Sequence, residues 1–127
     1  MTPDTPAPVG GQLLTELSNA MVALHRKHFG RGAGAAKSFM FDQIVLCLLT
    51  DICTPVEKTL MRVGKVEHVR QTRLMHQIAL EEEYKRPVEE LTGRKVRAFV
   101  SSVHFDPDIA VELFILEPES GADQAVE

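Results

Sequence analysis

The 127-residue sequence contains no tryptophan and one tyrosine, and aromatic side chains make up only 6% of it. Proteins that bind single-stranded nucleic acid stack the bases on aromatic side chains that alternate with basic ones. Positive charge is not in excess either, because the formal net charge is -4 and the pI is about 5.7. Such a balance gives no general attraction to nucleic acid or to an anionic membrane surface. Composition therefore argues against nucleic acid as a partner.

Cysteines and long apolar runs are also scarce. Cys47 and Cys53 are the only cysteines and do not form a CxxC motif, which is typical of reduced thiols in a cytosolic protein. The longest uninterrupted apolar run, residues 44–49, is far shorter than the roughly 20 residues of a membrane-spanning helix. The first ten residues lack the charged and apolar regions of a secretory signal. We expect a cytoplasmic protein without direct membrane insertion, which reaches a membrane only through a partner.

Hydrophobic residues make up 44% of the sequence, which is enough for one hydrophobic core of modest size. Residues 1–11 are rich in proline and glycine and are predicted to form a disordered lead. Residues 118–127 are acidic and rich in small residues, which predicts a disordered acidic tail. The sequence between them, residues 12–117, is predicted to form a single α+β domain.

Helix signals are strongest in the middle of the chain. Thr54 and Glu57 are spaced for a capping box, and Pro55 suits the first helical position. A short helix is therefore predicted over residues 55–63, followed by a long helix over 66–86. Pro87 is expected to kink or break this long helix, with a last turn over 88–92 and Gly93 as its cap. The predicted apolar side of the long helix consists of Val69, Leu74, Met75, Ile78 and Ala79.

Apolar periodicity predicts the other elements. Steps of three and four residues indicate an amphipathic helix over residues 12–29. Residues 37–52 have strand composition, and the Asp42-Gln43 pair leaves open whether they form one bent strand or two short ones. Residues 95–103 and 109–116 alternate as hairpin strands around a turn at 104–108. One face of the second strand consists of Ile109, Val111, Leu113 and Ile115.

These elements predict an α+β fold with a small, mainly antiparallel sheet of three or four strands and helices packed on one face. The expected element order is α-β-α-α-β-β. The other sheet face is predicted to carry apolar residues such as Phe39 and Phe99. A second copy of the chain would cover that face, so we expect a homodimer.

Motifs for catalysis or metal binding are weak. The glycine-rich segment 30–34 follows a helix and precedes a strand, which is the reverse of a phosphate-binding loop. His25 and His28 have a usable spacing for a metal but lack further ligands. The glutamates of 81–83 and 89–90 point in different directions on a helix and do not converge. The sequence therefore predicts no catalytic residue, no metal and no cofactor.

The strongest basic cluster lies between residues 58 and 73. Its members are Lys58, Arg62, Lys65, Arg70 and Arg73. The first three share a helical face by spacing. The cluster suits an anionic ligand, a phosphate backbone or an acidic partner, and equally a solvated face paired with Glu57 and Glu67. The solvated face is the favoured interpretation, because charged helix faces are common.

Several segments in this order resemble the MpsC-like family of small bacterial proteins over about residues 12–118. They are Phe29-Gly30-Arg31-Gly32, residues 49–60, residues 88–96, His104-Phe105-Asp106-Pro107-Asp108 and residues 111–118. The resemblance implies association with a sodium-dependent, membrane-potential-generating system linked to inorganic-carbon uptake. It implies no catalytic residues. Whether sodium or bicarbonate is involved stays open at this point.

Among the polar positions that match the family, Arg31, Lys58 and Arg94 have no explanation as caps or turns. Together with Arg62 of the basic cluster, they are the candidate binding residues. The first hypothesis is a non-enzymatic accessory or regulatory protein that docks on a membrane transporter. The alternative is a small-anion sensor, since arginine recognises carboxylate, phosphate or bicarbonate with a forked geometry. Nucleic-acid binding ranks below both, and enzymatic activity ranks last.

Overall fold

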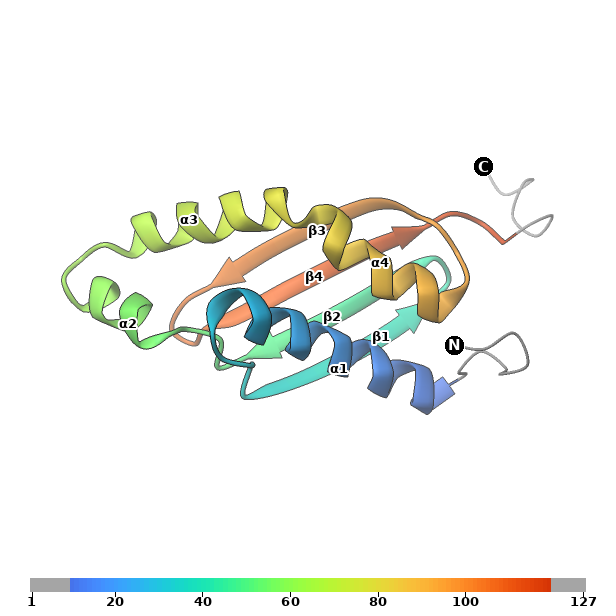
Figure 1. Ribbon diagram of the computed structural model, residues 1–127, viewed down its shortest axis with the longest axis horizontal. Coiled ribbons are helices and arrows are strands. Elements are labelled where there is room, and N and C mark those ends of the chain that lie inside the picture. The colour runs from blue at the N-terminus through green and yellow to red at the C-terminus, as the bar shows by residue number, and fades with distance from the viewer. Residues whose placement is uncertain (1–9, 120–127) are drawn as a thin grey trace.

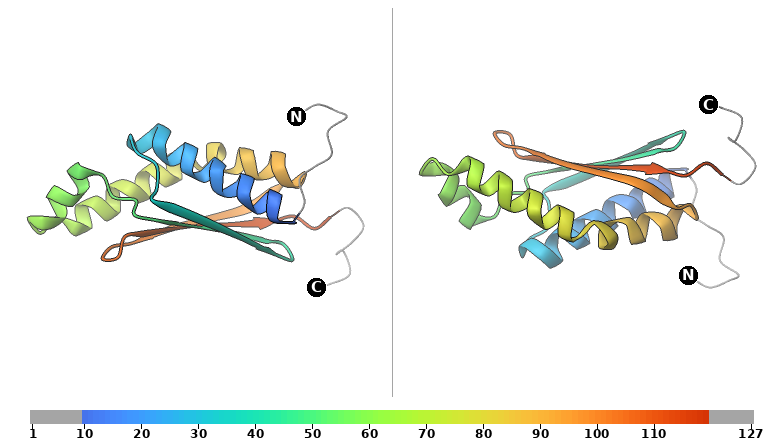
Figure 2. Two further views of the ribbon diagram at one scale, coloured as in Figure 1. Left: turned by 90° about the horizontal axis from the view of Figure 1, so that it is seen from below. Right: turned by 90° about the horizontal axis from the view of Figure 1, so that it is seen from above.

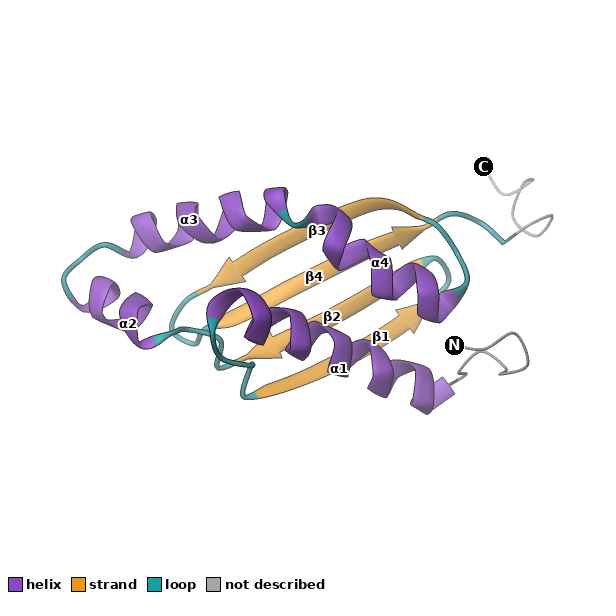
Figure 3. Ribbon diagram, viewed as in Figure 1, coloured by secondary structure: helices purple, strands orange, loops and turns teal. Residues whose placement is uncertain are grey.

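The computed structural model describes residues 10–119, which form a four-stranded antiparallel sheet with helices on one face (Figure 1, Figure 3). This confirms the predicted α+β class. The first half contains α1 (Gly10–Phe29), β1 (Ala35–Phe41), β2 (Ile44–Thr50) and α2 (Pro55–Arg62). The second half contains α3 (Val66–Ala79), α4 (Glu81–Thr92), β3 (Val96–His104) and β4 (Ile109–Leu116). Helix α1 already begins inside the predicted lead, and residues 1–9 and 120–127 lie outside the described residues.

The sheet has the order β1-β2-β4-β3, and every neighbouring pair is antiparallel. Residues 37–52 form two strands of a tight hairpin, which decides the alternative left open above. The turn consists of Asp42 and Gln43, with Asp42 in the left-handed region at a φ of 54°. The observed element order is α-β-β-α-α-α-β-β, so the predicted order of six elements was wrong.

The long helix expected over residues 66–86 is interrupted at Leu80 rather than at Pro87. Leu80 leaves helical geometry (φ -102°, ψ 10°) and separates α3 from α4. Helix α4 then continues through Pro87, which lacks only the N–H that would bond to the Glu83 carbonyl. The bend lets α4 bury Tyr84 against the sheet, and this packing decides the break. Gly93 ends α4 in the left-handed conformation, as predicted (φ 71°).

The core lies between the sheet and helices α1 and α4. Leu17 and Met21 of α1 and Tyr84 and Val88 of α4 are buried there. The strands contribute Val45, Cys47, Leu49, Val103, Ala110, Phe114 and Leu116. Phe99 stacks between Tyr84 and Phe114, with ring centroids 5.8 and 5.0 Å apart. Phe99 therefore lies on the helix-covered face, and its predicted place on the other face was wrong.

No described helix covers the opposite face of the sheet, as the edge views of Figure 2 show. Besides Ala35 at the start of β1, the strand register places eleven apolar residues on this side, which we call the open face. They are Phe39, Phe41, Ile44, Leu46, Leu48, Ala98, Val100, Ile109, Val111, Leu113 and Ile115. Phe39 lies here as predicted. The apolar face of the last strand, which the sequence did not assign to either side of the sheet, lies here as well.

Candidate functional site

Helix α2 and the first part of α3 project beyond one end of the sheet (Figure 1, Figure 2), and the two helices are called the helical arm, residues 55–79. The predicted capping box begins the arm. The Glu57 amide donates to the Thr54 hydroxyl at 3.1 Å, and the Thr54 amide donates to the Glu57 carboxylate at 2.9 Å. Helix α2 contains no buried residue. The arm therefore presents most of its surface for contact.

Arg73 anchors the arm to the rest of the domain. Its side chain is only 1% exposed, and its guanidinium donates to both oxygens of Glu57 at 2.7 and 2.8 Å. It also donates to the Ile52 carbonyl at 2.9 Å and lies 4.2 Å from the centroid of the Phe29 ring. Arg73 is thus a buried structural residue. Its predicted place on a solvated basic face was wrong.

His25 completes this buried cluster from α1. Its Nε2 atom lies 3.3 Å from the Arg73 guanidinium, and its Nδ1 atom contacts the Arg31 carbonyl. Because arginine only donates, Nε2 must accept, and the proton is then on Nδ1. Burial lowers the pKa of His25, which favours this neutral form. The other histidine of α1, His28, pairs with Glu83 at 3.1 Å. Among residues 10–119, no three His, Cys, Asp or Glu side chains are grouped to hold a metal ion.

A pocket of about 460 Å³ opens between α2 and the β3–β4 turn. Its lining consists of Cys53, Lys58, Met61, Arg62, Val66, Phe105, Asp106, Pro107 and Asp108. Two of the predicted binding residues meet there. The Lys58 ammonium has no hydrogen-bond or ion-pair partner within residues 10–119, and Arg62 makes only a 3.4 Å contact to Thr59. We call this site the cationic pocket.

Residues on the opposite wall of the cationic pocket stabilise the fold. The Asp108 carboxylate accepts from the Ile52 and Cys53 amides, both at 2.8 Å. Burial acts to raise the pKa of Asp108, but these backbone hydrogen bonds outweigh it and lower the pKa overall. Burial raises the pKa of the Cys53 thiol to about 12, so the thiol is a poor nucleophile. Lys58 and Arg62 are therefore the two cationic side chains of a pocket whose opposite wall carries Asp106 and Asp108.

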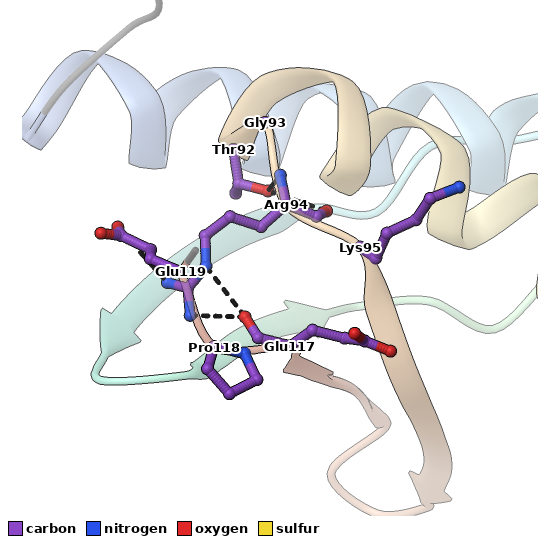
Figure 4. Close-up of a pocket in the computed structure, with 7 residues that line it drawn as sticks. All are labelled: Thr92, Gly93, Arg94, Lys95, Glu117, Pro118 and Glu119. Carbon is purple, nitrogen blue, oxygen red and sulfur yellow. Dashed lines mark hydrogen bonds and ion pairs between the residues drawn. The ribbon is translucent and has the colours of Figure 1, made fainter. Parts of the chain in front are cut away.

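The other two predicted binding residues, Arg31 and Arg94, have separate partners. Arg31 donates to the Cys53 carbonyl at 2.8 Å and to the Asp51 carboxylate at 3.2 Å. Arg94 donates twice to the Glu117 carbonyl, at 3.2 and 2.8 Å, beside a different pocket (Figure 4). That pocket lies at the end of the domain away from α2 (Figure 1). The structure therefore groups Lys58 with Arg62 and does not bring Arg31 or Arg94 to them.

With this geometry established, the chain can be compared with known proteins. The family described as "Na+-translocating membrane potential-generating system (MpsC)" matches residues 10–118. The chain belongs to the MpsC family. The match includes every helix and strand that the structure describes. No curated protein and no solved structure matches the chain significantly.

The family description links MpsC to a membrane system, and the structure shows which surfaces are exposed. No helix within residues 10–119 is long and apolar enough to cross a bilayer. Met75 and Ile78 of α3, predicted on the buried side of their helix, are 63% and 76% exposed. Val69, predicted on the same side, is buried, and it shares the buried side with Arg73 and Gln77. Apolar spacing alone did not distinguish this exposed stripe from a core-facing one.

A groove of about 320 Å³ runs between α3 of this MpsC chain and the edge strand β3. Leu74, Gln77 and Ile78 line it from α3, and Phe99, Val100 and Ser101 line it from β3, with Glu81 at one end. Gln77 is only 4% exposed, and its side-chain oxygen has no hydrogen-bond partner within the described residues. An unpaired buried acceptor costs free energy, so this groove favours an occupant that carries a hydrogen-bond donor. No pattern in the sequence predicted this groove.

Proposed function

We propose that this MpsC-family chain is a non-enzymatic accessory or regulatory protein. It docks on a protein component of the Na+-translocating membrane system through the groove between α3 and β3. The observation that carries this proposal is the groove itself, where exposed apolar side chains lie next to Gln77, a buried residue whose side-chain oxygen has no hydrogen-bond partner within the described residues. The family description supplies the kind of partner.

The chemistry of the groove suits a protein segment. Ile78 is 76% exposed, so a partner's apolar side chain gains free energy by covering it. A backbone or side-chain N–H of the same partner would satisfy Gln77. The buried ionisable groups Arg73, Glu57 and His25 bond mainly to one another and hold the arm in place, which supports a binding role over catalysis.

A crosslinking experiment in the native host tests the docking proposal. Tagged full-length protein is crosslinked, membranes are solubilised, and the captured proteins are identified by mass spectrometry. We expect to recover a membrane component of a Na+-translocating system, and to lose it with Ile78→Asp. Val63→Asp adds the same charge at an exposed arm position outside the groove and should leave recovery unchanged. Recovery that is insensitive to Ile78→Asp would contradict docking through the groove.

A second candidate function, sensing of a small anion, is favoured by the cationic pocket. Lys58 lacks a partner there and lies with Arg62 beside an apolar wall. Phosphate, bicarbonate and acetate are suitable probes, because each presents oxygens to a lysine or arginine. A ligand that binds only the folded state at tenfold its Kd adds about 1.4 kcal/mol to the free energy of unfolding.

We therefore expect one of these anions to raise the thermal midpoint by several degrees in a saturable way. The shift should disappear in Lys58→Ala and in Arg62→Ala. Lys95→Ala removes an exposed cation near Arg94, at the other end of the domain, and should keep the shift. An equal shift in all three variants would mean that the anion acts outside the cationic pocket. Calorimetric titration gives the Kd for comparison.

A further inference from the structure

The open face is an apolar sheet surface that no helix of residues 10–119 covers. Paired residues in the strand register lie in rows across the sheet, and one central row is Phe39, Leu46, Leu113 and Val100. The next row is Phe41, Ile44, Ile115 and Ala98. Every side chain in both rows is apolar. Phe39 and Phe41 are 38% and 54% exposed, although aromatic residues usually contribute large buried areas.

Polar groups on this side lie toward one end and along the edges. Lys37 is on the edge strand β1, and Ser102 and His104 are on the edge strand β3. The register places Lys37 and Ser102 in one row, across Leu48 and Val111. The arrangement has an apolar centre with polar groups at its margin, which is typical of protein interfaces.

We infer that two copies of this chain pair through their open faces, sheet against sheet. Antiparallel sheets pack in this way at about 10 Å separation, with the inner side chains of both sheets interdigitating. Such pairing is two-fold symmetric, so the same apolar residues face each other in both copies. Lys37 is the only lysine or arginine among the residues that the register pairs on this side, and it lies on an edge strand. The exposed Arg97 lies in the bulge of the other edge strand, where the register leaves it unpaired. Charge repulsion between the copies is therefore small.

The area of the open face suits a dimer. With strands about 4.8 Å apart and about 3.4 Å per residue, four strands of seven residues cover roughly 460 Å² of flat surface. Protruding side chains make the accessible area larger than this flat area. Two faces together therefore reach the roughly 1,000 Å² that a specific interface requires.

The segments outside the described residues are poor candidates to cover the open face. Residues 1–9 and 120–127 contain only three large apolar side chains, Met1, Val9 and Val126. Eleven apolar residues require a partner that is itself broadly apolar, and the open face of a second copy meets this need. Pairing does not rest on the proposed docking function, because α1, α3 and α4 lie on the opposite side of the sheet (Figure 2).

The test is the mass of the purified full-length chain by sedimentation equilibrium at micromolar concentrations. We expect a dimer for the wild type and a monomer for Leu113→Glu, which places a carboxylate in the central row. Met75→Glu adds the same charge on exposed α3 and should stay dimeric. Far-UV circular dichroism checks that each variant is folded.

If Leu113→Glu does not fold, Phe41→Glu replaces a more exposed residue of the same face. It should raise the dimer Kd by roughly tenfold or more. A wild-type monomer, or a dimer whose Kd is unchanged by the folded open-face variant, overturns the inference. Because this test uses the purified chain alone, its result is independent of whether a membrane protein is captured through the groove.

Discussion

Replacing Arg73 with methionine is expected to lower the free energy of unfolding by about 3–5 kcal/mol, the usual cost of removing one partner of a buried ion pair. Methionine retains much of the apolar volume but leaves the Glu57 carboxylate without the two charge-assisted hydrogen bonds at 2.7 and 2.8 Å. The Ile52 carbonyl also loses a donor. Burial acts to raise the pKa of Glu57, and hydrogen bonds from Arg73 and Thr54 outweigh it, so the pKa is lowered. Urea unfolding measures the loss.

Three further variants show whether the effect comes from the ion pair. Arg62→Ala removes an exposed-side arginine from the same arm, and we expect a change of about 0.5 kcal/mol or less. Glu57→Gln keeps a capping-box residue at that position and removes the charge. The double variant Arg73→Met with Glu57→Gln should therefore cost less than the sum of the two single changes. Additive costs would contradict the view that the two charges depend on each other.

Replacing Glu112 with glutamine is expected to stabilise the protein at neutral and higher pH. Glu112 is 2% exposed on the helix-covered face, and burial raises its pKa to about 7. The groups around it are the Ser101 hydroxyl that donates at 2.5 Å, Cys47 opposite in the register, Tyr84, and the charge of Arg73. Among them Arg73 has the only positive charge, and it is already paired with Glu57.

The raised pKa of Glu112 determines how the free energy of unfolding changes with pH. The folded state binds the Glu112 proton more tightly than the unfolded state does, so its contribution is fully present below the unfolded value of about 4.5. This contribution is lost as the pH rises through about 7. The shift corresponds to roughly 3 kcal/mol at pH 8. We expect Glu112→Gln to match the wild type near pH 4 and to exceed its free energy of unfolding by up to that amount at pH 8.

Urea unfolding of both proteins across this pH range measures the difference. His25 acts in the opposite direction, because its lowered pKa makes the fold lose stability as the pH falls below about 6.5. Both proteins contain His25, so its contribution cancels in the difference. Glu90→Gln changes an exposed glutamate and should give a pH-independent difference near zero. A flat difference for Glu112→Gln would show that Glu112 is ionised in the fold without penalty.

The features that the sequence predicted correctly are those with local signals. The Thr54–Glu57 capping box, the Gly93 cap and the final hairpin each depend on residues within a few positions of one another. Lys58 and Arg62 were grouped by their four-residue spacing, and the structure places both on the cationic pocket. Short-range geometry of this kind is fixed by helix periodicity alone.

The features that the sequence did not reveal depend on contacts between distant segments. Arg31 and Arg94 donate to backbone carbonyls 22 and 23 positions away, and a carbonyl has no sequence signature. Alternation in the last strand defines two faces but does not say which one the helices cover. The covered face contains Glu112 beside Phe114, whereas the more uniformly apolar face of Val111 and Leu113 lies open. A prediction from hydrophobicity alone would place the face of Val111 and Leu113 against the helices, which is the opposite of the observed arrangement.

The order β1-β2-β4-β3 also has a consequence for synthesis of the protein. Translation completes β1, β2 and β3 before β4, yet β4 must lie between β2 and β3. Until it emerges from the ribosome, the β1–β2 hairpin has an unpaired edge and β3 has no neighbour, a state that favours aggregation. A frameshift or premature stop before Ile109 therefore removes the centre of the sheet rather than its margin, and it leaves only the β1–β2 hairpin, which alone is marginally stable at best.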